Sequence, residues 1–244
     1  MTEMTHLYKI HSYETDVTGK ARVTSLLNYM QESAWNHAEA LNVGYSHLIE
    51  KKLVWVLARL RLKIFQFPQW GDTVTLKTWP SGYDRLCCFR DFLFTNSQME
   101  LAHASSTWIV VDLVNRRPQR TESYINLDVE HPPPVFAEFV PKIGAIEAAN
   151  VVSHTRVQYS DLDVNSHVNN VKYIEFLFNS FSEEFLSQHR LEDLTVNYMN
   201  EALLNDEISI RTHQHQDHLF FHLLTRGKDK VEILRAQTNW QATK

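Results

Sequence analysis

The strongest constraint on this chain is an internal repeat, because the second half of the sequence follows the first half in order. Asp16 and Asp163 each begin a short polar turn sequence that leads into a helical run. Three further pairs of segments match in the same order and at nearly constant spacing: 71–78 with 205–212, 84–89 with 217–222, and 104–108 with 236–240. Matches that keep their order and spacing indicate duplication of one structural unit. We therefore predict one fold built twice, as an N-terminal unit at 1–128 and a C-terminal unit at 151–244.

The segment between the two copies, 129–150, has the composition of a linker. It contains four of the seven prolines, namely Pro132, Pro133, Pro134 and Pro141. A proline triplet favours an extended polyproline conformation and cannot occupy a central strand. We therefore predict a proline-containing linker over 129–150.

Within each copy the hydrophobic periodicity changes from that of a helix to that of strands. Helical stripes lie at Val23, Leu27, Met30, Ala34, Ala38 and Leu41 in the first copy, and at Val171, Ile174, Phe178, Phe181 and Phe185 in the second. In the first copy, alternating runs follow at 54–64, 74–76, 86–94 and 107–113, with turn-like sequences at 80–82 and 95–97. A helix followed by antiparallel strands buries its stripe by covering one face of their sheet. The pattern predicts an α+β tandem double hotdog, in which each unit has one strand, a long helix and about four strands of a curved antiparallel β-sheet that wraps the helix.

Composition and charge exclude several classes of protein. The six glycines fall below the usual share of about 7%, and neither Gly19-Lys20 nor Gly227-Lys228 completes a phosphate-binding loop. A net charge of −5 argues against nucleic acid as a partner. No run approaches the roughly 18 apolar residues of a membrane-spanning helix. The adjacent Cys87 and Cys88 provide no disulfide framework, which fits a reducing cytosol.

The densest group of chemically useful side chains lies at Asp163, Asn165 and His167, just before the second predicted helix. The N-terminus of a helix offers unpaired backbone N–H groups that stabilise an oxyanion developing on a carbonyl. The alternative reading is that Asp163 or Asn165 merely caps the helix, which is a common role for both residue types. Capping needs no histidine, and the first copy carries Thr18 and Lys20 at the equivalent positions. We therefore expect one active site per chain, in the second unit.

The segment 161–173, Asp-Leu-Asp-Val-Asn-Ser-His-Val-Asn-Asn-Val-Lys-Tyr, resembles the signature of the acyl-ACP thioesterases of plants and bacteria. The resemblance covers nearly the whole chain, beginning by Tyr8. It implies a double-hotdog hydrolase that releases free fatty acid from acyl carrier protein (ACP). Its catalytic set falls on Asp163, Asn165, His167 and Glu201, and the adjacent Asn169 and Asn170 are expected to bind substrate.

The chain departs from many plant members at Ala202, where they carry cysteine. This departure excludes a cysteine-nucleophile triad, and Cys87 and Cys88 are expected to be packing residues. No plastid transit segment precedes the region of resemblance, so we expect a bacterial cytoplasmic enzyme.

The chemistry that we expect is attack of an activated water on the thioester. Glu201 and His167 would bind and deprotonate the water, while Asp163 and Asn165 would orient His167 and the thioester end. Direct attack by a carboxylate, giving an anhydride, stays open as an alternative. We expect no cofactor and no metal. The pair His213 and His215 resembles a metal site, but the repeat places it at a hairpin.

Substrate and partner follow from the resemblance. The family holds the acyl chain largely in the first unit, so Met30, Ala34 and Trp55 are candidates to line an acyl tunnel, with ordinary core as the alternative for each. ACP is acidic, and Arg116, Arg117, Arg120 and Lys172 are candidates to contact it, with a plain solvated surface as the alternative. Whether two chains form a homodimer is left open.

Other functions in the same fold remain as alternatives. An acyl-CoA thioesterase would hydrolyse the CoA ester as efficiently as the carrier-protein ester. A non-hydrolytic acyl-binding protein or a dehydratase would leave the thioester intact, so release of free thiol separates both from a hydrolase.

Overall fold

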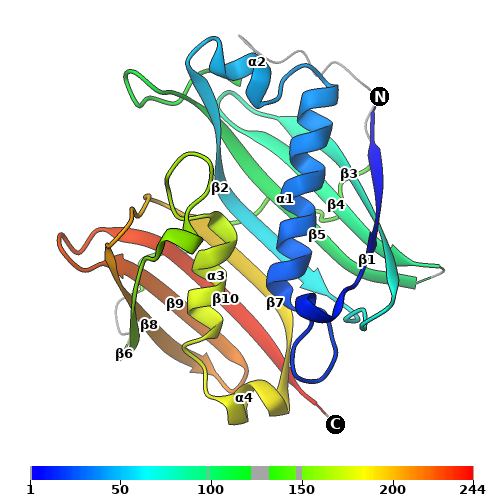
Figure 1. The fold of residues 1–244 in the computed structure, drawn as a ribbon, viewed down its shortest axis with the longest axis vertical. Helices are drawn as coiled ribbons and strands as arrows, with labels where there is room; N and C mark the ends of the chain where they lie inside the picture. Colours follow the sequence, from blue (N-terminus) through cyan, green and yellow to red (C-terminus); the bar gives the residue numbers. More distant parts are fainter. Residues whose placement is uncertain (1, 98, 122–131, 147–149, 244) are drawn as a thin grey trace. The chain divides into compact units, whose positions relative to one another are not determined.

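The computed structural model describes residues 2–97, 99–121, 132–146 and 150–243. The chain divides into two compact units, Met1–Val140 and Pro141–Lys244, which are described separately. The division falls within the segment predicted as the linker. Figure 1 gives the elements of both units.

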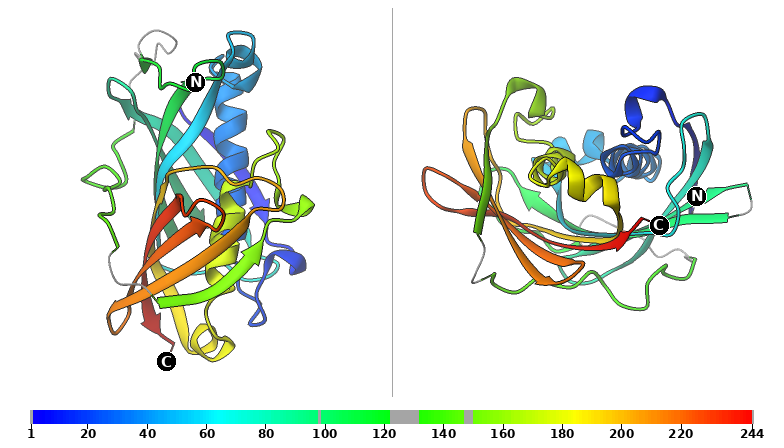
Figure 2. Two further views of the ribbon diagram at one scale, coloured as in Figure 1. Left: turned by 90° about the vertical axis from the view of Figure 1, so that its left-hand side faces the viewer. Right: turned by 90° about the horizontal axis from the view of Figure 1, so that it is seen from below.

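The first unit packs one long helix on an antiparallel sheet. The elements are β1 (Met4–Lys9), a short 3-10 turn (Ser12–Glu14), α1 (Val23–Ala40), α2 (Tyr45–Ile49), β2 (Leu53–Ile64), β3 (Thr73–Tyr83), β4 (Cys88–Asn96) and β5 (Met99–Asp112). Neighbouring strands pair antiparallel in the order β1-β3-β4-β5-β2. The sheet curves around α1, as Figure 2 shows.

The predicted stripe explains why α1 forms and where it packs. Leu27, Met30 and Ala34 of this stripe are buried on one face of α1, while Gln31 and Glu32 on the other face are exposed. Burial of a large apolar side chain such as Leu27 or Met30 stabilises the fold by roughly 1.5–3 kcal/mol. The predicted helix is confirmed.

The second unit repeats this plan. Its elements are β6 (Asn150–Arg156), a 3-10 turn (Tyr159–Asp161), α3 (Asn170–Phe178), α4 (Glu183–Gln188), β7 (His189–Tyr198), β8 (Glu207–Gln216), β9 (Leu219–Arg226) and β10 (Glu232–Ala242). Neighbouring strands pair antiparallel in the order β7-β10-β9-β8-β6. The predicted succession of strand, helix and four strands is therefore confirmed in both halves.

The prediction of one continuous helix through the second stripe is wrong, because the chain breaks between α3 and α4. The Ser180 hydroxyl donates to the carbonyl of Leu177 at 2.6 Å, and the Ser182 hydroxyl accepts from the N–H of Phe185 and caps α4. Serine side chains that bond to nearby backbone compete with a helix. The apolar stripe continues across the break, since the rings of Phe181 and Phe185 stack 4.9 Å apart.

The turn predicted at 80–82 is also wrong. Residues Pro80 and Gly82 lie inside β3, which continues to Tyr83 through a bulge between them. A bulge is one of the few places where a strand accepts proline, and Gly82 has a φ of 142°, which glycine tolerates. The chain turns instead at Asp84 and Cys87, whose backbones bond to each other. The turn predicted at 95–97 is confirmed, because β4 ends at Asn96.

The described part of the linker is held against the sheets rather than free. In the first unit, the N–H of Val135 donates to Asp91 and the ring of Phe139 stacks 4.0 Å from that of Phe89. In the second unit, Ile143 and Asn197 are joined by a hydrogen bond of 2.8 Å. No helix in the described part of the chain is long and apolar enough to cross a membrane.

Candidate active site

The loop that precedes α3 is built by the side chain of Asp163. Its Oδ1 accepts hydrogen bonds from the N–H groups of Asn165 at 2.8 Å and His167 at 3.3 Å. The backbone N–H of Asp163 donates to the carbonyl of His167, and Ser166 adopts a left-handed φ of 63° that closes the turn. Asp163 therefore fixes the backbone that carries His167.

Helix α3 is capped by Asn169, whereas the sequence suggested Asp163 or Asn165 as the cap. The Asn169 side chain accepts from the N–H of Val171 at 2.8 Å. The alternative in which Asp163 or Asn165 caps this helix is therefore wrong. In the described structure the exposed Asn165 side chain makes no hydrogen bond, and the carbonyl of Asn170 accepts from the Tyr198 hydroxyl.

His167 and Glu201 form the pair that the chemistry requires. The Nε2 of His167 lies 3.3 Å from Oε2 of Glu201, with 26% and 48% of the two side chains exposed. Both groups are thus in contact with each other and accessible to water and substrate. An imidazole and a carboxylate in contact can share the proton taken from a water molecule.

Main-chain bonds hold the two sides of this pair together. The N–H of Val168 donates to the carbonyl of Ala202 at 3.1 Å, and these residues directly follow His167 and Glu201. The N–H of Ala202 donates to the Tyr173 hydroxyl at 2.9 Å. The pair is therefore positioned by hydrogen bonds on adjacent residues.

Tyr173 and Arg226 are two supporting residues that the sequence did not indicate. Burial raises the pKa of Tyr173 above its ordinary value, and the charges of Glu201 and Asp163 raise it further, so the phenol stays neutral. The Arg226 guanidinium donates to the carbonyl of Glu201 and pairs with Asp229 at 2.7 Å. Tyr173 ends the signature segment, which was a usable signal, whereas nothing local singles out Arg226.

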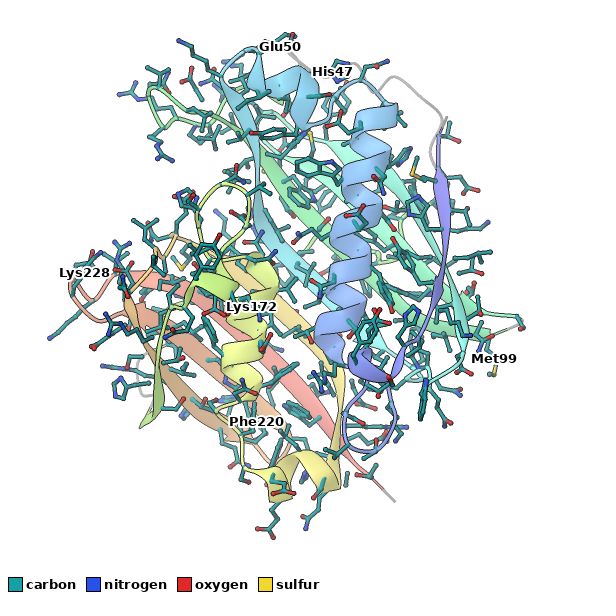
Figure 3. The ribbon with its side chains drawn as sticks, in the orientation of Figure 1. His47, Glu50, Met99, Lys172, Phe220 and Lys228 are labelled. Carbon is teal, nitrogen blue, oxygen red and sulfur yellow. The ribbon has the colours of Figure 1, made fainter. Side chains whose placement is uncertain are left out.

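Lys172 is already engaged within the second unit. Its ammonium lies 3.0 Å from Glu175 and 3.9 Å from Asp161. Figure 3 shows Lys172 at the beginning of α3 and Lys228 at the turn between β9 and β10. Lys228 is paired with Asp206 at 2.6 Å.

The other candidates lie in the first unit. Met30 and Ala34 are buried on α1, and the half-buried Trp55 on β2 donates to the carbonyl of Val43. Arg116, Arg117 and Arg120 are exposed in the loop after β5. Thr121, which follows Arg120, bonds to the carbonyls of Asp84 and Arg85, which brings the exposed Arg85 beside it.

The histidine pair lies within β8, so its predicted place in a hairpin is wrong. The rings of His213 and His215 lie 6.3 Å apart. Among the described residues, no group of three or more His, Cys, Asp and Glu side chains is arranged to hold a metal ion.

Comparison with known proteins identifies the family of this chain. Residues 2–126 match the acyl-ACP thioesterase N-terminal domain, and residues 145–242 match the acyl-ACP thioesterase C-terminal domain. A chloroplastic palmitoyl-acyl carrier protein thioesterase of Gossypium hirsutum is 30% identical over 96% of this chain and 62% of its own length. The chain thus spans about three fifths of the length of such plant relatives.

Two solved structures share the fold. An acyl-ACP thioesterase from Bacteroides thetaiotaomicron superposes with a TM-score of 0.88 at 23% identity, over 98% of each chain. The 12:0-ACP thioesterase from Umbellularia californica gives 0.89 at 24% identity, over 99% of this chain and 98% of the other. The predicted tandem hotdog fold is confirmed. Since the two domain matches together span most of the sequence, the chain belongs to the acyl-ACP thioesterase family.

Proposed function

We propose that this chain is a thioester hydrolase that releases free fatty acid from acyl-ACP. The observation that carries the proposal is the contact of 3.3 Å between His167 Nε2 and Glu201 Oε2, in the C-terminal domain of a member of this family. The plant relative is named as an acyl carrier protein thioesterase, which supports the same substrate class.

In the proposed reaction, a water molecule bound to His167 and Glu201 attacks the thioester carbonyl carbon. The pair takes the proton of the water, so a tetrahedral intermediate with a negative oxygen forms. The intermediate collapses, the C–S bond breaks, and the proton passes to the thiolate. The products are the fatty acid and the free carrier thiol.

The beginning of α3 supplies a candidate donor for the negative oxygen. The N–H groups of Val171 and Lys172 are bonded to Asn169. The N–H of Asn170 has no hydrogen-bond partner among the described residues, which makes it the candidate donor to an oxyanion. Such donors, preorganised where charge develops, supply a large share of catalysis in acyl transfer.

The proposal extends to substrate and location. The acyl chain is bound against Met30, Ala34 and Trp55. Its thioester end lies at Asn169 and Asn170. Arg116, Arg117 and Arg120, with the adjacent Arg85, contact the acidic carrier. Lys172 is a weaker candidate for contact with the carrier than these arginines, because the carboxylates of Asp161 and Glu175 already neutralise its charge. The free thiols of Cys87 and Cys88 support a cytoplasmic location.

Thiol release from a series of acyl-ACPs of different chain length tests the proposal. The wild type should release thiol, and the corresponding acyl-CoA esters should be poorer substrates. An equal kcat/KM with acyl-CoA and acyl-ACP would instead favour an acyl-CoA thioesterase. Binding of acyl-ACP without thiol release would show that the protein is not a hydrolase.

A further inference from the structure

The first unit contains a buried cation that the proposed reaction does not use. Arg90 on β4 lies under α1 and is 8% exposed. Its Nη1 donates to Nδ1 of His37 at 3.0 Å and to the hydroxyl of Thr78 at 3.2 Å. Because Nδ1 of His37 accepts from a guanidinium, this imidazole is neutral and carries its proton on Nε2.

The charge of Arg90 has no carboxylate partner in the described residues. Burial lowers its pKa to about 10, so it stays protonated at neutral pH. The adjacent Asp91 points to the opposite face of the sheet, where it accepts from the N–H of Val135. Buried charges in proteins are ordinarily paired, because an unpaired one has lost its hydration without compensation. A cation held only by neutral groups is therefore suited to receive a ligand.

Arg90 also has donors left over. Both of its bonds use Nη1, while Nε and Nη2 make no hydrogen bond within the described structure. Arg90 as a whole keeps 8% of its surface exposed. His37 and Thr78, by contrast, are fully buried. Of the three residues in this polar cluster, Arg90 is thus the one that keeps some exposed surface.

This cluster continues the surface proposed for the acyl chain. Met30, Ala34 and His37 follow one another at steps of four and three residues on the buried face of α1. On the sheet, Phe92 lies two residues from Arg90 on the same face of β4. Arg90 itself pairs with Ser106 on β5. The apolar surface formed by Met30, Ala34 and Phe92 therefore continues to a cationic side chain, Arg90.

We propose that Arg90, held by His37 and Thr78, is a subsite for an acceptor oxygen carried on the acyl chain. This inference rests on the proposed thioesterase function and narrows its substrate class to acyl groups that bear a hydroxyl, keto or carboxyl oxygen at a fixed distance from the thioester. Such an oxygen accepts from Nε or Nη2 of Arg90. A methylene group at the same place leaves these donors without a partner, so a plain chain is the poorer substrate.

The test compares matched substrates and two matched variants. ACP is loaded with acyl chains of one length that are plain, hydroxylated at successive carbons, or carboxylated at the far end, and kcat/KM is measured for each. The wild type should prefer one oxygen position by roughly 10-fold or more over the plain chain, as expected for a hydrogen bond to a charged group. Arg90→Met should lose this preference while still hydrolysing the plain chain.

Arg61→Met is the matched control. Arg61 is an arginine on the neighbouring part of the sheet, on β2, with its guanidinium 4.5 Å from the ring of Phe136. It should keep the preference. The inference is wrong if the wild type shows no dependence on oxygen position, or if Arg90→Met slows all substrates equally. If the wild type releases no thiol from any substrate, the proposed function itself fails and the subsite fails with it.

A measurement on the wild type avoids dependence on the folding of the variant. Free fatty acids of one length, plain and oxygenated, are added and the thermal midpoint is recorded. A ligand that binds the native state more tightly raises the midpoint further. The oxygenated acid should give the larger rise, and an equal rise with the plain acid would contradict the subsite.

Discussion

The loops at 14–22 and 161–169 have the same backbone and different chemistry. In the first unit, Oδ1 of Asp16 accepts from the N–H groups of Thr18 at 2.8 Å and Lys20 at 3.2 Å. In the second unit, Asp163 accepts in the same way from Asn165 and His167. Gly19 and Ser166 take the left-handed conformation at equivalent places.

The partner strands match as well. Ala21 donates to the carbonyl of Pro68 as Val168 donates to that of Ala202. The residue before Pro68 is Phe67, which therefore stands where the second unit has Glu201. The first unit thus keeps the turn and lacks both the imidazole and the carboxylate. The comparison teaches that the aspartate builds the loop in both units, and that two side chains turn one of these loops into a candidate active site.

The largest expected difference between the loops is catalytic. His167→Ala should lower thiol release on the order of 10²-fold or more, because the proton acceptor is lost. Lys20→Ala at the equivalent position should leave the rate within about 2-fold, since Lys20 has no place in the proposed chemistry. Thermal unfolding of both variants checks that they are folded. Equal losses would show that the comparison between loops is mistaken.

A second contrast lies in the cores. His222 is fully buried between the hydroxyls of Thr212 and Thr238, both at 2.9 Å. Strand register places Phe92 at the equivalent position of the first unit, three residues after the Phe89 that the match of 84–89 with 217–222 predicted. Burial lowers the pKa of His222 to about 3. As the pH falls, the imidazole of His222 is therefore protonated in the unfolded state at a higher pH than in the native state. The contribution of the neutral imidazole to stability is complete above about pH 6.5 and is lost as the pH falls towards 3.

His222→Phe should remove part of that pH dependence. It should also cost roughly 1–3 kcal/mol at pH 7, because two buried hydroxyls lose their partner. Urea unfolding at pH 7 and pH 5 measures both effects. If the variant and the wild type lose the same free energy of unfolding between pH 7 and pH 5, His222 is not the cause of the pH dependence.

The two loop aspartates should separate stability from activity. Asp163→Ala and Asp16→Ala should each lower the free energy of unfolding by about 1 kcal/mol, because each loses local hydrogen bonds. Only Asp163→Ala should also slow thiol release, by roughly 10-fold, since a displaced loop misplaces His167. Urea unfolding and a rate assay on the same preparations test this. Equal loss of activity in both variants would show that the effect is global.

The smallest contrast concerns the two helix caps. Asn169→Ala should lower the free energy of unfolding by about 1 kcal/mol, because its side chain caps α3. Arg22→Ala at the start of α1 is the control, since Arg22 makes no side-chain cap. Its effect should stay within about 0.5 kcal/mol. If the two substitutions prove equally costly by urea unfolding, the cap is not what stabilises α3.

Part of the fold and of the site could be predicted because it depends on local patterns. The stripe from Val23 to Leu41 predicted α1, and the matching order of segments predicted two similar units. The break at Ser180 and Ser182 was missed because the apolar stripe continues across it. The strand through Pro80 and Gly82 was missed because the bulge depends on pairing with β4.

The sequence by itself determined the repeat, the polar turn at 161–169 and the presence of an imidazole in only one of the two matching turns, since each depends on residues close along the chain. The family resemblance implied that His167 works with Glu201, and only the tertiary structure gave their contact, because their loops are joined by bonds between residues distant in sequence. It also decided that Arg90 lies under α1 beside His37 without a carboxylate. Periodicity gives the face on which a side chain lies, whereas strand pairing and helix packing select its neighbours.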